Sequence, residues 1–408
     1  MLEKAFSGSR RYWGWVLFLL VVMAVGFSVY LSQALTGGDA SGLSRDVPWG
    51  FFIANYTFMV GVAASAVMVV LPYYLHNQKD FGRLTTLGEF LAVAAIATTL
   101  LFIMADLGQP GRAFNIILYA TPNSPFFWNT IILPGYLLIN LVTAWFTLDA
   151  ERQEVRVPGW VRLLIFVSIP WAISIHTMTS FVYSGLAARP LWNSAILTPR
   201  FLASAFASGP ALLIILAVVV RKFAGFDVGG KAIQKLATIV TYATITNLFL
   251  VVAELFSVVF TNVGSHMESF QYLYFGLDGK DGLVPFTWVS TLLSVVAIIM
   301  LVNPATRRNE RSLLVACTAV YFSMWIDKGL CLVVGGFIPS PLGDVTEYLP
   351  TVAELLIAAA IYATAALILT VLYKITIAVK EEEVTPSAFT SGLPEANGRF
   401  VVEVGAGK

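Results

Sequence analysis

Two stretches of this sequence place proton-exchanging side chains beside long apolar runs. Residues 105–112 read ADLGQPGR, in which Asp106 ends an apolar run, a Gly/Pro pair breaks the helix and Arg112 follows. Residues 176–209 begin with His176 and end on FLASAFASG. Carboxylates and imidazoles inside or beside a membrane are groups that exchange protons with a substrate or an ion path. The rest of the chain must form the scaffold that brings these two stretches together.

The composition identifies the kind of scaffold. The chain has 408 residues, of which 58% are hydrophobic and only 12% charged, and its net charge is +1. The mean hydropathy of +0.79 excludes an ordinary soluble domain. The small net charge gives no reason to expect a nucleic-acid partner, so the chain is predicted to be a polytopic membrane protein that contacts membrane lipids.

Ten transmembrane helices are expected, because about 20 consecutive apolar residues cross the hydrocarbon layer. The first apolar run is too long for a signal peptide and is predicted to be retained. Continuous apolar runs of this length exclude the alternating strands of a barrel, so the fold class is all-α. The predicted spans are 12–35, 50–75, 84–105, 126–148, 160–184, 198–222, 235–263, 283–303, 312–337 and 350–379.

The distribution of Lys and Arg predicts the orientation. Of the 25 basic residues, 19 lie on the side of the two termini, five on the other side and Lys328 within a span. The positive-inside rule therefore places both termini in the cytoplasm of a prokaryotic cell, and the loop after Asp106 faces outward. Residues 380–408 are expected to form a cytoplasmic tail that is disordered or acts as a docking arm.

Residues 1–379 are predicted to form one membrane domain with two repeats, 50–184 and 198–337. Residues 52–55 (FIAN) resemble residues 201–204 (FLAS) at an offset of 149, and residues 105–107 (ADL) resemble residues 253–255 (AEL) at an offset of 148. Two nearly equal offsets favour two four-helix bundles with a flanking helix at each end. Chance similarity between apolar helices is the alternative.

Ionisable residues within predicted spans fall mainly in one outer layer. His176 lies about 15 residues into its span, or ~23 Å at 1.5 Å per residue. Function is the default hypothesis for such groups, because burying them in lipid is costly. Six residues from five spans make up this layer: Asp106, His176, Glu254, Asp327, Lys328 and Glu354. Glu89 is the exception and lies near the cytoplasmic side.

Each of these residues also has a structural interpretation. His176 can be a hydrogen-bonded packing residue, and Asp106 can end a helix with Arg112 as its ion-pair partner. Lys328 needs a carboxylate from another helix, for which Glu254 and Glu354 are the candidates. Glu89 can extend to the inner interface or belong to a proton path; the other proton-path candidates are Glu254, Asp327, Lys328 and Glu354.

Quinone chemistry suits this layer, because it moves two electrons and two protons and requires polar groups at the ring carbonyls. Asn55, Tyr56, Asp106 and His176 could supply these groups. His76 and His266 fall in loops, and Cys317 and Cys331 form no CxxC motif. Paired-His haem ligation and an iron–sulfur cluster are therefore not expected in this chain, and the electrons must pass through a partner.

The same two stretches resemble the NrfD/polysulfide-reductase membrane-subunit family. Residues 1–15, 44–77 and 325–351 are similar to its DsrP branch, which is associated with dissimilatory sulfite reduction. The resemblance implies a quinone-interacting subunit, here for menaquinone, without a cofactor of its own. By motif position it assigns functional roles to Asp106, Arg112 and His176, and less securely to Glu254 and Asp327.

The resemblance also implies partners. These are a periplasmic ferredoxin-like iron–sulfur subunit, a haem b membrane subunit, a periplasmic multihaem cytochrome c and a cytoplasmic iron–sulfur subunit. The expected function is exchange of electrons between menaquinone and a docked iron–sulfur subunit, with Asp106, His176 and Glu254 exchanging the protons. An ion- or proton-translocating subunit similar to a secondary transporter, and a purely structural membrane anchor, are the alternatives.

Overall fold

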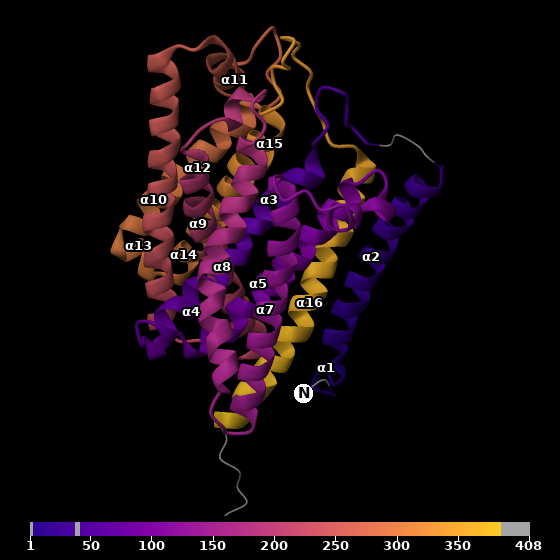
Figure 1. Cartoon of the computed structure of the whole chain (residues 1–408). Coiled ribbons are helices and arrows are strands. Elements are labelled where there is room, and N and C mark those ends of the chain that lie inside the picture. The colour runs from indigo at the N-terminus through magenta and orange to yellow at the C-terminus, as the bar shows by residue number, and fades with distance from the viewer. Residues whose placement is uncertain (1–2, 37–40, 385–408) are drawn as a thin grey trace, which may run out of the picture.

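The computed structural model describes residues 3–36 and 41–384, and every regular element of this part is a helix apart from one isolated β-bridge. Ten of its helices are long and apolar enough to cross a membrane, which confirms the predicted fold class (Figure 1). The spans are α2 (Arg10–Thr36), α3 with α4 (Phe51–Val62 and Val67–Tyr74), α5 (Gly82–Asp106), α7 (Pro125–Arg152), α8 (Gly159–Ser184), α9 (Leu197–Ala224), α10 (Gly230–Thr261), α12 (Val284–Val302), α14 with η5 and α15 (Glu310–Met324, Trp325–Cys331 and Leu332–Gly335) and α16 (Val352–Val384).

Short helices lie between and beside these spans. They are α1 (Glu3–Phe6), η1 (Ala63–Ser65), η2 (Lys79–Phe81), η3 (Pro110–Arg112), α6 (Asn115–Leu118), η4 (Pro190–Trp192), α11 (Gly264–Phe275) and α13 (Pro304–Arg308). Figure 1 shows α1 and the end of α16 at one end of the bundle and α11 at the other. We call these the inner end and the outer end.

The last helix is longer than the apolar pattern predicted. It continues to Val384, about one helical turn beyond the predicted end of the tenth span at residue 379. The apolar pattern stops near that residue, but helix-forming Lys and Glu residues extend the helix. The remainder of the predicted tail, 385–408, lies outside the described residues.

Helix α3 lies at the centre of the bundle and α2 at its edge. The most apolar stretch of the second span is 89% buried, whereas that of α2 is 17% buried. Helix α3 packs against α5, α9 and η5, while α2 packs mainly against α16 (Figure 1). Within each predicted repeat, consecutive spans pack side by side. The repeat itself stays a prediction.

Glycines allow α9 and η5 to approach the backbone of α3. A Cβ at Gly209 would lie 2.8 Å from Ser65 N and 2.9 Å from Val62 O, and one at Gly329 would lie 3.0 Å from Ala54 O. Such close approach is the usual role of small residues between membrane helices, because no hydrophobic force drives helices together in lipid. These glycines fix the distance between α3 and the two helices that carry the charged residues.

Two spans are interrupted near this contact. Helix η1 breaks the second span, and η5 is a π-helix within the ninth span that contains Asp327 and Lys328. π-Helical turns are rare and occur frequently at functional sites. The apolar pattern of the sequence did not reveal either interruption, because both segments remain apolar overall.

The glycine contact generates a first prediction. Gly209→Ala should lower the free energy of unfolding of the purified protein in detergent by about 1–3 kcal/mol. The added Cβ would meet backbone atoms, which cannot move aside by a side-chain rotation. Gly14→Ala in α2 is the matched control, since a Cβ at this position would meet no atom within 4 Å. The control should be neutral or slightly stabilising. Equal stability of the two variants in a thermal unfolding assay would contradict the close packing.

Candidate functional site

Asp106 is the last residue of α5 and is partly buried near the outer end. Its Oδ1 atom is buried and has no hydrogen-bond partner among the described residues. Glu354, Tyr183 and Tyr348 lie within electrostatic range of its carboxyl group. A buried carboxyl oxygen without a partner is unusual and is available to a ligand.

Arg112 does not satisfy this carboxyl group. It lies in η3, its side chain is exposed, and it forms no ion pair with Asp106 in the described part of the chain. The alternative in which Arg112 is the ion-pair partner of Asp106 is therefore wrong. Helix α5 ends at Asp106, and Gly108 and Pro110 lie between this residue and the exposed arginine.

Glu354 has a clear structural role. Its Oε2 accepts hydrogen bonds from the backbone of Thr351 at 2.7 Å and of Gly42 at 3.2 Å, and Thr351 Oγ1 accepts from the Glu354 backbone at 3.3 Å. This reciprocal pair is a capping box at the start of α16. Burial raises the pKa of Tyr348, so its hydroxyl keeps its proton and donates to Glu354 Oε1 at 2.8 Å.

Asn55 and Tyr56 lie in α3 but are engaged within the protein. Asn55 Oδ1 accepts hydrogen bonds from Tyr362 at 2.6 Å and from Trp325 at 2.9 Å, and its Nδ2 donates to Phe51 O at 2.7 Å. The Tyr56 hydroxyl accepts a hydrogen bond from Asn129. These contacts connect α3 to α7, α16 and η5, and they leave less capacity for a ligand than the sequence suggested.

His176 and Lys328 lie deeper and within electrostatic range of each other. His176 is fully buried, and neither of its ring nitrogens has a hydrogen-bond partner among the described residues. Lys328 Nζ donates to Phe201 O at 3.4 Å and lies 4.3 Å from the centre of the Phe201 ring. A Cβ at Gly61 would lie 3.2 Å from this nitrogen, so the ammonium group rests against α3.

Arg200, rather than Lys328, pairs with the carboxylates of the predicted layer. Its Nη1 lies 3.0 Å from Glu254 Oε2 and its Nη2 lies 2.6 Å from Asp327 Oδ1. The predicted partners of Lys328, Glu254 and Glu354, are both engaged elsewhere, so that prediction is wrong. Arg200 lies one turn inside α9, where its forked guanidinium group reaches α10 and η5 together.

The sequence contains a signal for Arg200, although the residue was grouped with the outer loops. It directly precedes the apolar stretch FLASAFASG, which places it at the start of a span. The predicted layer held four acidic residues and one lysine, so pairing of its charges required a further cation.

A largely apolar cavity of about 410 Å³ lies between α2, α5 and α16. Phe27 and Leu101 at its walls are partly exposed, so the cavity borders the lipid. Ala105 and Ile361 line it, and the next residues along their helices are Asp106 and Tyr362. The remaining lining residues are Met23, Ala24, Gly26, Tyr30, Met104, Ile357, Ala360 and Thr364. An apolar ligand in this cavity would thus lie against the last turn of α5, the helix that ends at Asp106.

Glu89 lies in the inner half of α5, away from this group. Its side chain is only 3% exposed, and it lies near the Thr143 hydroxyl and within electrostatic range of Tyr74 and Tyr136. The alternative that Glu89 extends to the inner interface is therefore wrong. Its place in a proton path stays a prediction.

Residues 39–339 match the family described as "Polysulphide reductase, NrfD". The chain belongs to the NrfD family. This matched region includes α3 to α15 and both stretches that suggested the resemblance, whereas α2 and α16 lie outside it. Two of the three helices that surround the apolar cavity therefore flank the matched NrfD region.

Curated relatives of the chain include subunits of reductases and of an oxidoreductase. An Hdr-like menaquinol oxidoreductase integral membrane subunit from Archaeoglobus fulgidus is 25% identical over 352 residues, covering 85% of this chain and 84% of that protein. A selenate reductase subunit from Mesobacillus selenatarsenatis is 25% identical over 64% of this chain and 67% of that protein. A polysulfide reductase subunit from Wolinella succinogenes is 25% identical over 45% of this chain and 63% of that protein.

The buried ion pairs generate a second prediction. Arg200→Gln should destabilise the protein by about 3–5 kcal/mol, because it leaves Glu254 and Asp327 as unpaired buried charges. Arg221→Gln is the control at the other end of the same helix, where the pair with Glu310 is exposed and contributes little. Thermal unfolding in detergent should show a clearly lower midpoint temperature for Arg200→Gln than for Arg221→Gln. A mild effect in both would show that the Arg200 pairs are not essential to the fold.

Proposed function

We propose that this NrfD-family chain is the quinone-binding membrane subunit of a multi-subunit respiratory electron-transfer complex. The apolar cavity carries the proposal, because it borders the lipid and lies against the last turn of α5. This helix ends at Asp106, whose Oδ1 atom has no partner among the described residues. A quinone has the matching chemistry, with a long apolar tail and a ring whose carbonyls exchange protons. Reactive residues beside lipid-accessible apolar cavities suit such substrates.

In this proposal the tail lies between α2, α5 and α16, and the ring lies toward the outer end of α5. The volume of about 410 Å³ falls within the usual range of small-molecule sites, so it suits the ring and the first part of the tail. Asp106 then exchanges a proton with the ring. His176, whose ring nitrogens have no partner in the described part of the chain, exchanges or relays a second proton from deeper in the bundle.

The contacts change the role that we propose for Glu254. Its carboxylate is engaged in an ion pair with Arg200, which suits a structural charge better than a proton carrier. Asp327 is bound by the same arginine. Asn55 and Tyr56 support the site by orienting α3, and Arg112 lies at the exposed outer rim, where it can contact a partner.

The electrons are proposed to pass to or from a docked iron–sulfur subunit at the outer end. Large hydrophobic side chains are exposed just after the Asp106 turn, which suits subunit docking. They are Phe114, Ile117, Leu118 and Tyr119. The similarity to the menaquinol oxidoreductase subunit from Archaeoglobus fulgidus favours menaquinone as the substrate.

The resemblance to the DsrP branch supports a finer proposal, in which the complex serves dissimilatory sulfur metabolism. Its partners would be the periplasmic ferredoxin-like subunit, a multihaem cytochrome c, a haem b membrane subunit and a cytoplasmic iron–sulfur protein. The basic residues at the inner end support a cytoplasmic location of both termini in a prokaryotic cytoplasmic membrane.

A proton-translocating role is the second candidate, and buried Glu89 favours it. Glu89 provides a titratable group in the inner half of the same helix that ends at Asp106. A transporter with paired broken helices is less favoured, because the two interrupted spans are the second and the ninth and do not correspond in the two predicted repeats. Proton uptake by the complex reconstituted in vesicles, compared with Glu89→Gln, would test this role.

The proposal predicts the effect of removing the proton-exchanging groups. Asp106→Asn and His176→Ala should each lower quinol-dependent electron transfer by the purified complex by about 10²- to 10⁴-fold, the usual contribution of a general acid or base. Subunit composition should be unchanged. Asp278→Asn, in an exposed outer turn, is the control and should keep wild-type activity. Full activity of both variants would assign the quinone to another subunit and leave this chain as an anchor.

The cavity predicts that affinity depends on tail length. Ala105→Phe should weaken binding of a menaquinone analogue with an isoprenoid tail by roughly tenfold or more, since each buried CH₂ contributes ~0.8 kcal/mol. A tail-free naphthoquinone should bind this variant nearly as well as wild type. Ala359→Phe, an exposed position on α16 outside the cavity, is the control. Fluorescence quenching titrations would measure the affinity of each variant for both quinones. An equal loss of affinity for the tailed and the tail-free quinone would contradict the proposal that the tail lies in this cavity.

A further inference from the structure

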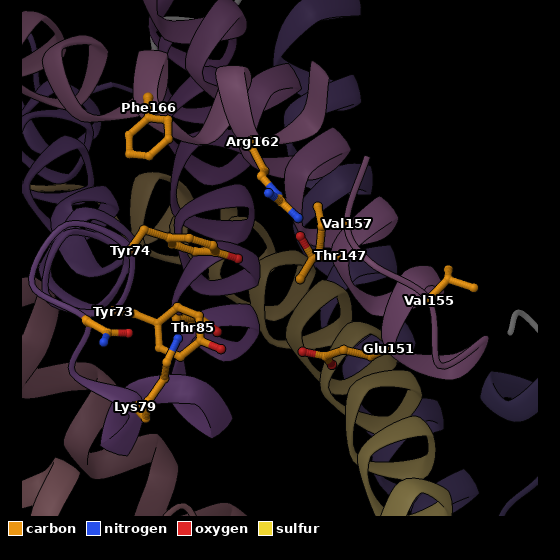
Figure 2. Close-up of a pocket in the computed structure, with 11 residues that line it drawn as sticks. Tyr73, Tyr74, Lys79, Thr85, Thr147, Glu151, Val155, Val157, Arg162 and Phe166 are labelled. Atoms are coloured by element: carbon orange, nitrogen blue, oxygen red, sulfur yellow. The ribbon is translucent and has the colours of Figure 1, made fainter. Parts of the chain in front are cut away.

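A second hollow lies at the inner end of the bundle, far along the helices from Asp106. It has a volume of about 360 Å³ and is bordered by α4, η2, α5, α7, α8 and the segment that joins α7 to α8. Figure 2 shows its lining residues. They are Tyr73, Tyr74, Asn77, Lys79, Thr85, Thr147, Glu151, Val155, Val157, Arg162 and Phe166.

Two cations in this hollow have no carboxylate partner in the described part of the chain. Arg162 and Lys79 form no ion pair there, although Lys79 lies 5.0 Å from the centre of the Tyr73 ring. The acidic group in the hollow, Glu151, is already neutralised by Lys380 at 2.7 Å. The hollow therefore has an excess of positive charge and suits an anion.

The polar groups converge on one space. Figure 2 shows the Arg162 guanidinium group, the Tyr74 hydroxyl and the Lys79 side chain pointing into the hollow from three different segments of the chain. Asn77 and Tyr73 add further hydrogen-bonding groups. This arrangement can hold a phosphate through charge-assisted hydrogen bonds and a polar headgroup through neutral ones.

The remaining wall is apolar and faces lipid. Phe166 lies one turn beyond Arg162 on α8, and its side chain is 44% exposed. Only 33% of the most apolar stretch of α8 is buried within the protein, so this helix has a broad face toward the membrane. Val155 and Val157 continue the apolar rim. The hollow thus combines a cationic polar part with an apolar border at membrane depth.

We propose that this hollow binds the headgroup of an anionic phospholipid. The phosphate lies between Arg162 and Lys79, the tyrosine and asparagine groups contact the glycerol or headgroup, and an acyl chain lies along Phe166. Basic pockets between transmembrane helices are known to select anionic lipids. The apolar rim distinguishes this occupant from a soluble phosphate, which would gain nothing from Phe166. Such a lipid would link the inner end of α4 and α5 to that of α8.

The test uses the full-length protein, purified in detergent with any subunits that copurify. Native mass spectrometry would measure binding of dioleoyl phosphatidylglycerol and, separately, of dioleoyl phosphatidylcholine with the same acyl chains. We expect the anionic lipid to bind more tightly. The double variant Lys79→Gln/Arg162→Gln should weaken its binding by roughly 30-fold, which is the contribution of two interfacial basic residues.

Arg156→Gln is the matched control, because Arg156 is an exposed arginine between the lining residues Val155 and Val157 but outside the hollow. This control should bind the lipid as wild type does. Equal binding of the two lipids, equal loss in the control, or displacement of the lipid by millimolar inorganic phosphate would overturn the proposal. If the double variant cannot be purified in folded form, the single variant Arg162→Gln provides the test. Its affinity for the anionic lipid should be about fivefold weaker than that of the wild type.

Discussion

The bridge from Arg200 to Glu254 and Asp327 is the interaction on which the outer half of the bundle depends. Charges inside a membrane are tolerated only when they are paired, and this single guanidinium group pairs two carboxylates from two other spans. It thereby fixes α9, α10 and the π-helical turn η5 relative to one another. With Asp327 held on one side of this turn, Lys328 is directed to the other, against α3 and toward His176.

This constraint explains why the candidate residues separate into distinct groups rather than one layer. Among the described residues, Oδ1 of Asp106 has no partner at the outer end of α5 beside an apolar cavity, and neither ring nitrogen of His176 has one deeper in α8. The acidic residues that do have partners, Glu254, Asp327 and Glu354, hold helices in place. The groups left without partners in this part of the chain are therefore the ones best suited to bind a substrate.

The sequence predicted the ten spans because apolar length is sufficient to recognise a membrane helix. It did not predict partners, since these depend on which faces of helices meet. The ion pairs of Arg200 were missed for this reason, and η5 was missed because a π-turn leaves the apolar pattern intact. The cap at Glu354 was readable, because Thr351 and Glu354 have the spacing of a capping box.

The apolar cavity is closed by α2 and α16, the first and the last of the ten candidate spans in the described residues. About 330 residues separate its lining residues on these two helices, and ribosomes add ~5–20 residues per second, so α2 waits on the order of tens of seconds for its partner. During that interval the cavity lacks the wall that α16 provides. The cavity is therefore complete only once α16 has been made and has packed against α2.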